Sequence, residues 1–382
     1  MAMVRSQNGR RADIVAQSIH ELCAEDAESV AQFNERLARA GVTFRFPTSP
    51  ADLVRSPESR EEPYQRAYVL SVDSVVRGGY ILKSERLFAG EAELAAGNYQ
   101  LPLSEGIIAR QYAMVGLQLL KDALRRQPRL YCLGMGGMSR PLPQMLKRLS
   151  WDVSEVPFLF RIEDPSAFRR EIRWLRQRNR LRLLLDTAYY SGMLSAVVRG
   201  GRLRRRLTRI KIPADASIDS VRSLPGEIDE TFQRLRNRYG LVADRSAEAM
   251  RLKLPIQDSR LRRLILSRNG RVDGWIVFSV SQLENHTQFG DMTLGCLIDG
   301  MASGDDVHVL IANACREIES CGCHLVVSNQ THPTWITALE RQGFFKGPSN
   351  FVLALSPPLA EARSAAGCAH FNRADGDGPI NL

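Results

Sequence analysis

The chain contains two copies of one sequence pattern, and this repeat constrains its fold more than any other feature. Residues 75–83 read VVRGGYILK, and residues 271–279 read RVDGWIVFS. Both stretches combine an arginine-bearing turn, a glycine, an aromatic residue and an apolar strand, and Gly79 and Gly274 lie 195 residues apart. The same pattern at a long internal offset indicates two copies of one structural unit.

The elements that follow each glycine also occur in the same order. Each copy continues with a second strand, an apolar-periodic helix, a short strand, a short helix and a closing strand. We expect these elements at 97–106, 117–124, 130–133, 141–151 and 156–162, and again at 290–300, 310–318, 325–328, 333–344 and 351–355. Helices are expected before the copies, at 27–40 and 227–239. This order predicts an α+β fold with two tandem domains, each a mixed and mostly antiparallel sheet flanked by helices.

The length of 382 residues suits two domains of about 150 residues each. We expect a polar tail at 1–25, a first domain at 26–165, a basic linker with one or two helices at 166–215, a second domain at 216–356 and a disordered tail at 357–382. No apolar run reaches the ~20 residues that span a bilayer, and the basic N-terminus lacks the apolar core of a secretory signal. A cytoplasmic protein is therefore expected.

The cysteines give no indication of a metal site. Seven of them are scattered over the chain, which fits reduced thiols rather than a disulfide framework. Cys321, Cys323 and His324 lie close in sequence, but their spacing departs from that of a CxxC zinc knuckle. We expect no bound metal.

The positive charge is concentrated in one segment. The net charge is +10, and residues 161–211 contain 15 Arg or Lys against 4 Asp or Glu. Within this segment, 183–198 is apolar except for Asp186. Residues 168–211 therefore suggest either a helix on an anionic membrane surface or a linker packed between domains with solvated arginines. Nucleic-acid contact is a third reading, disfavoured because exposed aromatics and a recognised binding module are missing.

The repeat order and one local motif resemble the GNAT acyltransferase fold. Residues 332–345 read HPTWITALERQGFF, and the family pattern near this place is N-x-x-A-I-x-L-Y-x-x-x-G-F. His332 stands at the Asn position, Ile336 matches Ile, and the Gly-Phe pair of the pattern matches at 343–344. The first copy carries a fainter echo, SRPLPQMLKRLSW, which begins at Ser139. The stretch 239–254 and the strand after it resemble tandem, FemAB-like proteins of this kind.

The resemblance implies acyl-CoA as co-substrate. GNAT enzymes hold the CoA pyrophosphate on backbone amides at the start of the central helix, with the pattern Q/R-x-x-G-x-G/A, because free N–H groups and the helix dipole favour an anion there. In the first copy Gln111 and Gly116 fit, Met114 replaces the first glycine and Arg110 adds positive charge. Ser139 is implied as a further cofactor contact. In the second copy two carboxylates, at 305 and 306, stand where phosphate would bind, so CoA is expected in the first copy.

Acyl transfer to an amine needs a group that takes the amine proton. The base candidates of the first copy are Glu85, Glu91 and Glu105, and Glu105 ranks first because it ends the strand nearest the proposed CoA helix. The alternative proton carriers are Tyr99 and Tyr131. In the second copy an acceptor cleft is expected from Glu284, His286, Asp291 and His332. The tyrosine of the family pattern is replaced by Leu146 in one copy and Leu339 in the other.

Three functions remain open from the sequence. The first is an acyl-CoA-dependent N-acyltransferase for a small or lipid-linked amine, such as an amino sugar or a precursor in cell-envelope or polysaccharide synthesis. The second is a FemAB-like transferase that uses aminoacyl-tRNA. The third is a non-catalytic binding or scaffold protein, which the two missing tyrosines and altered phosphate loops would fit. A membrane-surface helix would place the protein peripherally at the inner face of a membrane.

Overall fold

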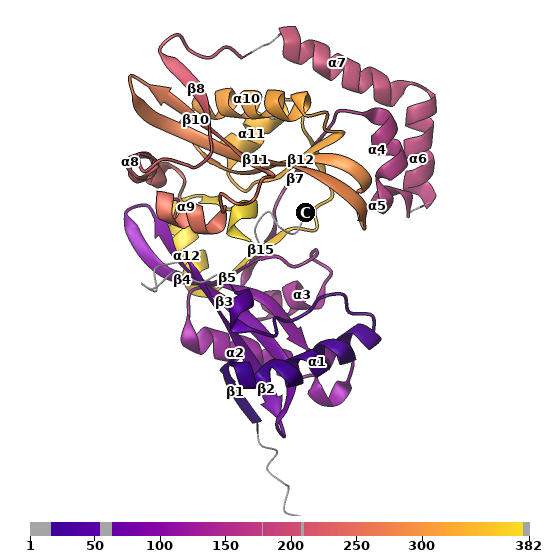
Figure 1. Cartoon of the computed structure of the whole chain (residues 1–382), viewed down its shortest axis with the longest axis vertical. Coiled ribbons are helices and arrows are strands. Elements are labelled where there is room, and N and C mark those ends of the chain that lie inside the picture. Colours follow the sequence, from indigo (N-terminus) through magenta and orange to yellow (C-terminus); the bar gives the residue numbers. More distant parts are fainter. Residues whose placement is uncertain (1–16, 54–62, 178, 208–209, 377–382) are drawn as a thin grey trace, which may run out of the picture. The chain divides into compact units, whose positions relative to one another are not determined.

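The computed structural model describes residues 17–53, 63–177, 179–207 and 210–376, which belong to two compact units (Figure 1). Unit 1 comprises Met1–Val54, Gln65–Lys83 and Tyr99–Arg126, and unit 2 comprises Arg55–Tyr64, Ser84–Asn98 and Gln127–Leu382. The division falls inside two long strands, β3 (Val75–Ala89) and β4 (Ala92–Ser104). The domain limits expected from the repeat stay a prediction.

Unit 1 contains the first strands of a nine-stranded sheet and two helices that pack on them. β1 (Gln17–Glu21) pairs antiparallel with β2 (Tyr64–Val72), and β3 and β4 follow in the sheet. α1 (Ala27–Arg39) contributes Val30, Phe33 and Leu37 to a core that also contains Phe46. α2 (Val115–Arg126) begins after the short turns η3 (Glu105–Ile107) and η4 (Arg110–Tyr112). The strands and helices expected in this part of the chain are therefore present.

The glycine pair of the repeat allows close packing on both sides of β3. A Cβ added to Gly78 would lie 2.7 Å from Val115 Cγ1 of α2, and one added to Gly79 would lie 2.7 Å from Phe46 Cζ. Successive residues of a strand point to opposite faces, so the two glycines admit close packing on both sides. In the second copy, a Cβ on Gly274 would lie 2.6 Å from Ala302 Cβ. The repeated glycine thus marks a close approach rather than a turn.

We expect Gly79→Ala to lower the free energy of unfolding by about 1–3 kcal/mol, because the added methyl group overpacks a filled core. The nearest backbone atom, Tyr68 O, would lie 2.9 Å from the new Cβ, so a side-chain rotation cannot relieve the whole clash. Urea unfolding measures the change. Gly90→Ala is the comparison for a glycine with open space around it, and its own cost comes from its positive φ. Equal stability of Gly79→Ala and the wild type would contradict the packing argument.

The main sheet of unit 2 is mixed and mostly antiparallel. Its strands lie in the order β14 (Phe345–Gly347), β7 (Phe158–Ile162), β13 (Leu325–Asn329), β12 (Gly290–Met301), β11 (Arg271–His286), β10 (Leu261–Arg268) and β8 (Ala216–Val221). α8 (Ile228–Leu235), α10 (Asp306–Ser320) and α11 (Pro333–Arg341) add buried apolar side chains to the core around this sheet. The expected fold class, α+β with mixed sheets flanked by helices, is confirmed.

The closing strands pair differently from our expectation that each closes its own copy. β7 belongs to the first copy by sequence, yet it pairs antiparallel with β13 of the second copy. β15 (Val352–Leu355) belongs to the second copy and pairs with β5 (Leu130–Gly134) and β6 (Asp152–Glu155) of the first. Pro157 separates β6 from β7 and has no N–H to donate to a ladder, which favours a change of sheet at this point.

The expected tails are ordered over part of their length. In the first tail, residues 17–26 form β1 and the turn η1 (Ala24–Asp26), and residues 1–16 lie outside the described part. In the second tail, α12 (Pro357–Ala366), β16 (Ala369–His370) and η6 (Arg373–Asp375) replace the disorder we expected up to residue 376. The Ala- and Pro-rich composition suggested disorder, but the two prolines stand in the first turn of α12, where proline is compatible with a helix. The side chains after this helix are buried and held by polar contacts.

The basic segment is helical, with more helices than the one or two expected. Its described part forms α4 (Pro165–Glu171), α5 (Arg173–Arg176), α6 (Asn179–Tyr190) and α7 (Met193–Leu207). Gly192 between α6 and α7 has a positive φ of 74°, which allows the sharp change of direction there. Every described helix falls short of the length and apolar character that crossing a membrane requires.

Candidate functional site

The start of α2 in unit 1 is open in the way that a phosphate-binding helix requires. Arg110, Gln111 and Met114 are exposed just before the helix, and a Cβ on Gly116 would have no atom within 4 Å. The first turn of an α-helix leaves N–H groups without an acceptor in the helix, and the helix dipole adds positive potential. Three residues predicted to bind the cofactor therefore lie together at one helix end.

The corresponding start of α10 in unit 2 is already occupied by charge. Asp305 is the N-cap residue, and Asp306 is buried in the first turn. Both oxygens of Asp306 accept hydrogen bonds from Arg268, at 2.6 and 2.8 Å, and Arg268 also lies 3.3 Å from Asp273. The hydrogen bonds to Asp306 raise the pKa of Arg268. A carboxylate and its arginine thus take the place that an anion would need.

The first-ranked base, Glu105, is held in a buried ion-pair cluster of unit 1. Its Oε1 lies 2.5 Å from Arg36 Nε, and its Oε2 lies 2.8 Å from Arg77 Nη1. Arg36 also donates to Val76 O at 2.7 Å, so the cluster joins α1, β3 and η3. Each oxygen of the carboxylate is therefore engaged by an arginine. The role of Glu105 as a base stays a prediction.

The other predicted proton carriers lie in different surroundings. Tyr99 is buried in unit 1, with its ring 5.2 Å from that of Tyr80. Tyr131 is buried in unit 2, where its hydroxyl donates to the carboxylate of Glu85 and lies 2.9 Å from Asp375 O. Burial and then the charge of Glu85 raise the pKa of Tyr131. Tyr131 and Glu85, two of the sequence candidates, therefore meet in one hydrogen bond.

Glu85 and Tyr131 belong to a wider buried network in unit 2. Lys253 Nζ lies 3.3 Å from Glu85 Oε1 and 3.4 Å from Asp375 Oδ1. Arg245 is fully buried and lies 2.6 Å from Asp375 and 2.9 Å from Asp299. Three carboxylates thus face two cations, which leaves one negative charge in excess among these five residues.

The ionisation of this network follows from its pairing. Burial opposes the charge of Asp375, but the neighbouring Arg245 and Lys253 outweigh burial and hold its pKa below the usual value. Burial, followed by the charge of Arg245, lowers the pKa of His370, so its ring is neutral at pH 7. Arg245, Lys253, Asp299 and Asp375 were not among the residues predicted from the sequence. Only the fold brings them together, and no motif in the sequence marks them.

The C-terminal segment completes the network. β12 and β13 pair in parallel up to Leu297 and Ser328. Beyond this point the segment 369–372 lies against β12 and against the residue after β13. His370 Nε2 is 3.0 Å from Gly300 O, Asn372 Nδ2 donates to Asp299 at 2.6 Å, and Asn372 forms an isolated β-bridge with Gln330.

The four residues expected to line an acceptor cleft do not meet. Glu284, His286 and Asp291 lie at one end of the β11–β12 hairpin, where Asp291 Oδ1 accepts from Asn285 N at 2.6 Å. His332 is buried as the N-cap residue of α11, and its ring lies 4.7 Å from that of Tyr239. Burial lowers the pKa of His332. Since β12 runs ~30 Å between these places, one small ligand cannot touch all four.

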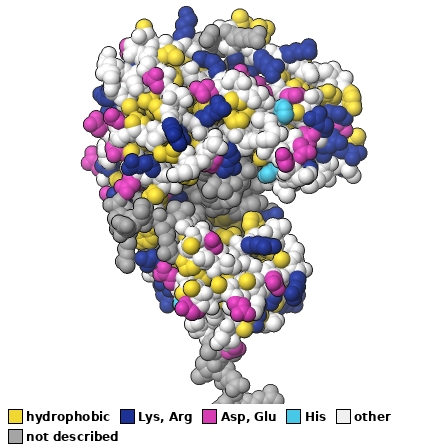
Figure 2. Space-filling model, viewed as in Figure 1, with side chains coloured by type: hydrophobic (Ala, Val, Ile, Leu, Met, Phe, Trp, Pro, Cys, Tyr) yellow, Lys and Arg dark blue, Asp and Glu magenta, His cyan; other side chains and the backbone are white. Residues whose placement is uncertain are grey.

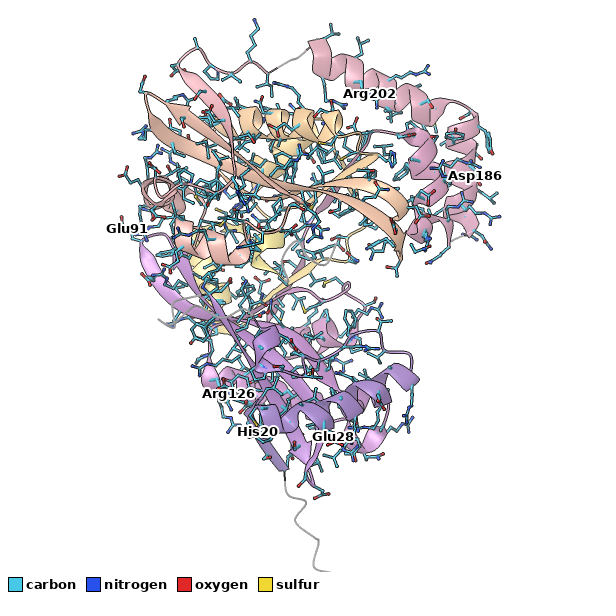
Figure 3. The ribbon with its side chains drawn as sticks, viewed as in Figure 1. His20, Glu28, Glu91, Arg126, Asp186 and Arg202 are labelled. Carbon is cyan, nitrogen blue, oxygen red and sulfur yellow. The ribbon has the colours of Figure 1, made fainter. Side chains whose placement is uncertain are left out.

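The remaining candidates are solvent-facing. Ser139 is exposed in the loop before α3 (Pro141–Arg148), and Glu91 is exposed at the turn between β3 and β4, where Figure 3 labels it at the outer end of the hairpin. Neither position shows a feature that separates it from an ordinary surface residue. Their predicted roles stay predictions.

Unit 1 also contains a pocket. Its volume is about 400 Å³, which falls in the range of small-ligand sites. The lining residues are Asn34, Arg45, Phe46, Pro47, Thr48, Asp52, Leu53, Gln65 and Ile81. Asn34 fixes the loop above α1, because its amide binds both the N–H and the carbonyl of Phe46 at 2.8 Å. The pocket thus combines an apolar wall with one basic and one acidic residue.

One group of possible metal ligands converges among the described residues. The ligand atoms of His20, Cys23 and Asp26 lie within 4.8 Å of one another (His20 is labelled in Figure 3). Asp26 accepts from Cys23 N at 3.0 Å in a capping box at η1, which accounts for the arrangement. Hydrogen bonds with Glu25 and Asp26 raise the pKa of Cys23 to about 11, which disfavours the thiolate. The expectation of no bound metal stays a prediction.

Comparison with known proteins identifies the fold. No family model and no curated protein matches the sequence. Among solved structures, N-myristoyltransferase of Saccharomyces cerevisiae with bound myristoyl-CoA matches at 11% identity and a TM-score of 0.50, over 89% of this chain and 82% of that chain. A GCN5-related N-acetyltransferase of Anabaena variabilis matches at 10% identity and a TM-score of 0.51, over 89% of this chain and 72% of that chain. The chain therefore has the GNAT acyltransferase fold, with the order of its elements present twice.

Proposed function

We propose that this protein is an N-acyltransferase that takes an acyl group from acyl-CoA and transfers it to an amine. The shared fold supports this class, since both neighbours described above are N-acyltransferases by name. The observation that carries the proposal is the difference between the starts of α2 and α10. One helix end is open and flanked by an arginine, and the other is closed by Asp306 and Arg268.

The first copy fits the pyrophosphate of CoA. Free N–H groups of the first turn of α2 and the helix dipole favour an anion, and the exposed Arg110 adds a positive charge. Gly116 leaves room for a phosphate to reach the backbone, because no atom lies within 4 Å of its missing Cβ. We assign the donor to this helix end and not to α10.

When bound, acyl-CoA would supply a thioester carbonyl as the electrophile. An alkylamine with a pKa near ~10 is mostly protonated at pH 7, so the protein has to accept a proton. Leu146 and Leu339 at the family's tyrosine positions are compatible with transfer, since a thiol of pKa ~8.5 leaves as a thiolate without an acid.

The acceptor to test first is the amine of an amino sugar or of a lipid-linked precursor, as the sequence resemblance implied. A broader amine panel then defines the class. Aminoacyl-tRNA serves as the competing donor, and its use in place of acyl-CoA would favour the FemAB-like alternative. Binding of neither donor would favour a scaffold protein.

We expect Gly116→Glu to weaken CoA binding by a factor of about ten or more. The new carboxylate repels the pyrophosphate by roughly 1 kcal/mol even when solvated, and its side chain also covers the helix end. Isothermal titration with CoA, acetyl-CoA and longer acyl-CoAs measures the affinity. Activity should fall through a higher KM for the donor.

The matched control is Ser303→Glu, which adds the same charge next to the start of α10. This variant should bind CoA as the wild type does, because α10 already holds Asp306 with Arg268. If Ser303→Glu abolished binding and Gly116→Glu preserved it, the donor would belong to the second copy. An absence of CoA binding by the wild type would overturn the proposed function itself.

A further inference from the structure

The inner faces of α6 and α7 are fixed to unit 2. Leu185 of α6 and Val198 of α7 are buried in its main core. Arg169 Nε lies 2.8 Å from Asp186 of α6, and Arg205 of α7 lies 3.4 Å from Glu319 (Figure 3 labels Asp186). These contacts determine which face of each helix turns outward.

The outward face of α6 is apolar. Leu183, Leu184 and Tyr190 are exposed to 63%, 66% and 73%. Counted from Leu183, Leu184, Thr187 and Tyr190 follow after one, four and seven residues. This spacing places all four on one side of the helix, opposite Leu185. Isolated exposed leucines are common on proteins, but a row on one helix face indicates a contact surface.

The outward face of α7 repeats this arrangement. Met193, Val197, Leu203 and Leu207 are exposed to 58%, 48%, 58% and 78%. Their spacing of four, ten and fourteen residues from Met193 places them on one side of a 15-residue helix, away from the buried Val198. Two consecutive helices of unit 2 thus each carry an apolar stripe on the outside and a packed stripe on the inside.

Positive charge surrounds both stripes. Residues 179–207 contain seven arginines and one carboxylate, Asp186, which Arg169 already holds. Arg180, Arg182 and Arg199 are exposed, and no described carboxylate lies within ion-pair distance of them. Figure 2 shows Lys and Arg side chains beside hydrophobic ones in this part of the surface, at the upper right. The surface therefore combines exposed apolar side chains with three arginines that have no ion-pair partner among the described residues.

We propose that α6 and α7 form a docking surface for an anionic lipid membrane. The leucines, Met193 and Tyr190 enter the boundary between headgroups and acyl chains, and the arginines bind lipid phosphates or carboxylates. At 1.5 Å per residue α7 is ~22 Å long, so it lies in the plane of the interface and does not span the bilayer. This role is independent of the proposed acyl transfer.

Charge complementarity favours a membrane over the other occupants. A protein partner would have to match two apolar stripes and the exposed Arg180, Arg182 and Arg199, whereas an anionic bilayer supplies apolar and acidic components over its whole surface. A nucleic acid would satisfy the arginines but leave the leucines in water. An interfacial helix needs both the apolar and the basic face, which is the combination present here.

The test is co-sedimentation of the full chain with phosphatidylcholine vesicles that contain or lack phosphatidylserine. We expect at least ~10-fold stronger binding to the anionic vesicles, weakening with salt. The variant Leu184→Glu/Leu203→Glu should lose at least ~10-fold of this binding, because it places carboxylates on the apolar stripes. Arg180→Gln/Arg182→Gln/Arg199→Gln should lower the binding and flatten its salt dependence.

The matched control is Leu149→Glu, an exposed leucine of unit 2 outside the two helices, which should bind vesicles as the wild type does. Thermal unfolding checks that all variants fold, and Leu184→Ser/Leu203→Ser replaces the glutamate variant if it does not. No binding to anionic vesicles, or equal binding to both kinds, overturns the proposal. So does a dimer in light scattering that the leucine variants dissociate, or RNA binding that only the arginine variant loses.

Discussion

Replacing Arg245 with methionine should lower the free energy of unfolding by about 3–5 kcal/mol at pH 7, which is the largest stability effect we expect in this protein. The guanidinium is fully buried and pairs with both Asp299 and Asp375. Methionine fills similar space but leaves the two carboxylates without their main cation. Urea unfolding of the full chain measures the change.

The stability of the wild type and of Arg245→Met should change with pH in opposite directions. In the wild type the depressed pKa of Asp375 contributes stability that is present above pH ~4 and is lost as the pH falls further. In Arg245→Met the two buried carboxylates have lost their main cation, so their negative charge destabilises the fold. Protonation removes this charge, and the difference in unfolding free energy between variant and wild type should therefore shrink between pH 7 and pH 5.

The control for Arg245→Met is Lys346→Met, which breaks an exposed pair with Glu340 in the same unit. We expect a change within about 0.5 kcal/mol, as is usual for surface ion pairs. Equal effects of the two substitutions, or a deficit that grows as the pH falls, would contradict the buried pairing.

Replacing Glu85 with glutamine should lower the free energy of unfolding by about 1–3 kcal/mol at pH 7. The amide keeps the shape of the buried side chain but carries no charge, so Tyr131 and the side chain of Lys253 each lose a charged partner. Urea unfolding of the full chain measures the change.

Glu91→Gln is the matched control, because the sequence offered both glutamates as bases and the structure places Glu91 at an exposed turn. Its stability should equal that of the wild type within about 0.5 kcal/mol, as is usual for an exposed position. A loss in Glu91→Gln as large as that in Glu85→Gln would contradict the role of the buried hydrogen bond and ion pair of Glu85.

Features that depend on neighbouring residues were predictable from the sequence. The spacing of apolar residues placed α1, α2, α10 and α11 to within a few residues, because helical periodicity reflects one buried face. The repeat of Gly79 and Gly274 predicted two copies of one order, and the same close packing explains both. Gln111 and Gly116 lie together at a helix start because they are five residues apart.

Features that join distant residues were not predictable in this way. Glu105 ranked first as a base because it ends a strand, yet its two carboxylate oxygens form ion pairs with Arg36 and Arg77. Nothing in the sequence distinguished Glu85 from the other candidate bases, although its carboxylate accepts a hydrogen bond from Tyr131, 46 residues further along the chain. The composition of the C-terminal segment suggested disorder, whereas contacts with β12 bury Asn372 and its neighbours.

The sequence by itself therefore determined the main elements of the two copies, their twofold order and the likeness to the GNAT fold, since local apolar patterns and close-packing glycines encode these. Only the tertiary structure decided the exchange of β7 and β15 between copies, the closure of the α10 end by Arg268 and the buried network around Arg245. The physical reason is that a buried charge is stable only with a partner. Such partners come from segments far apart in the chain, so no local pattern records them.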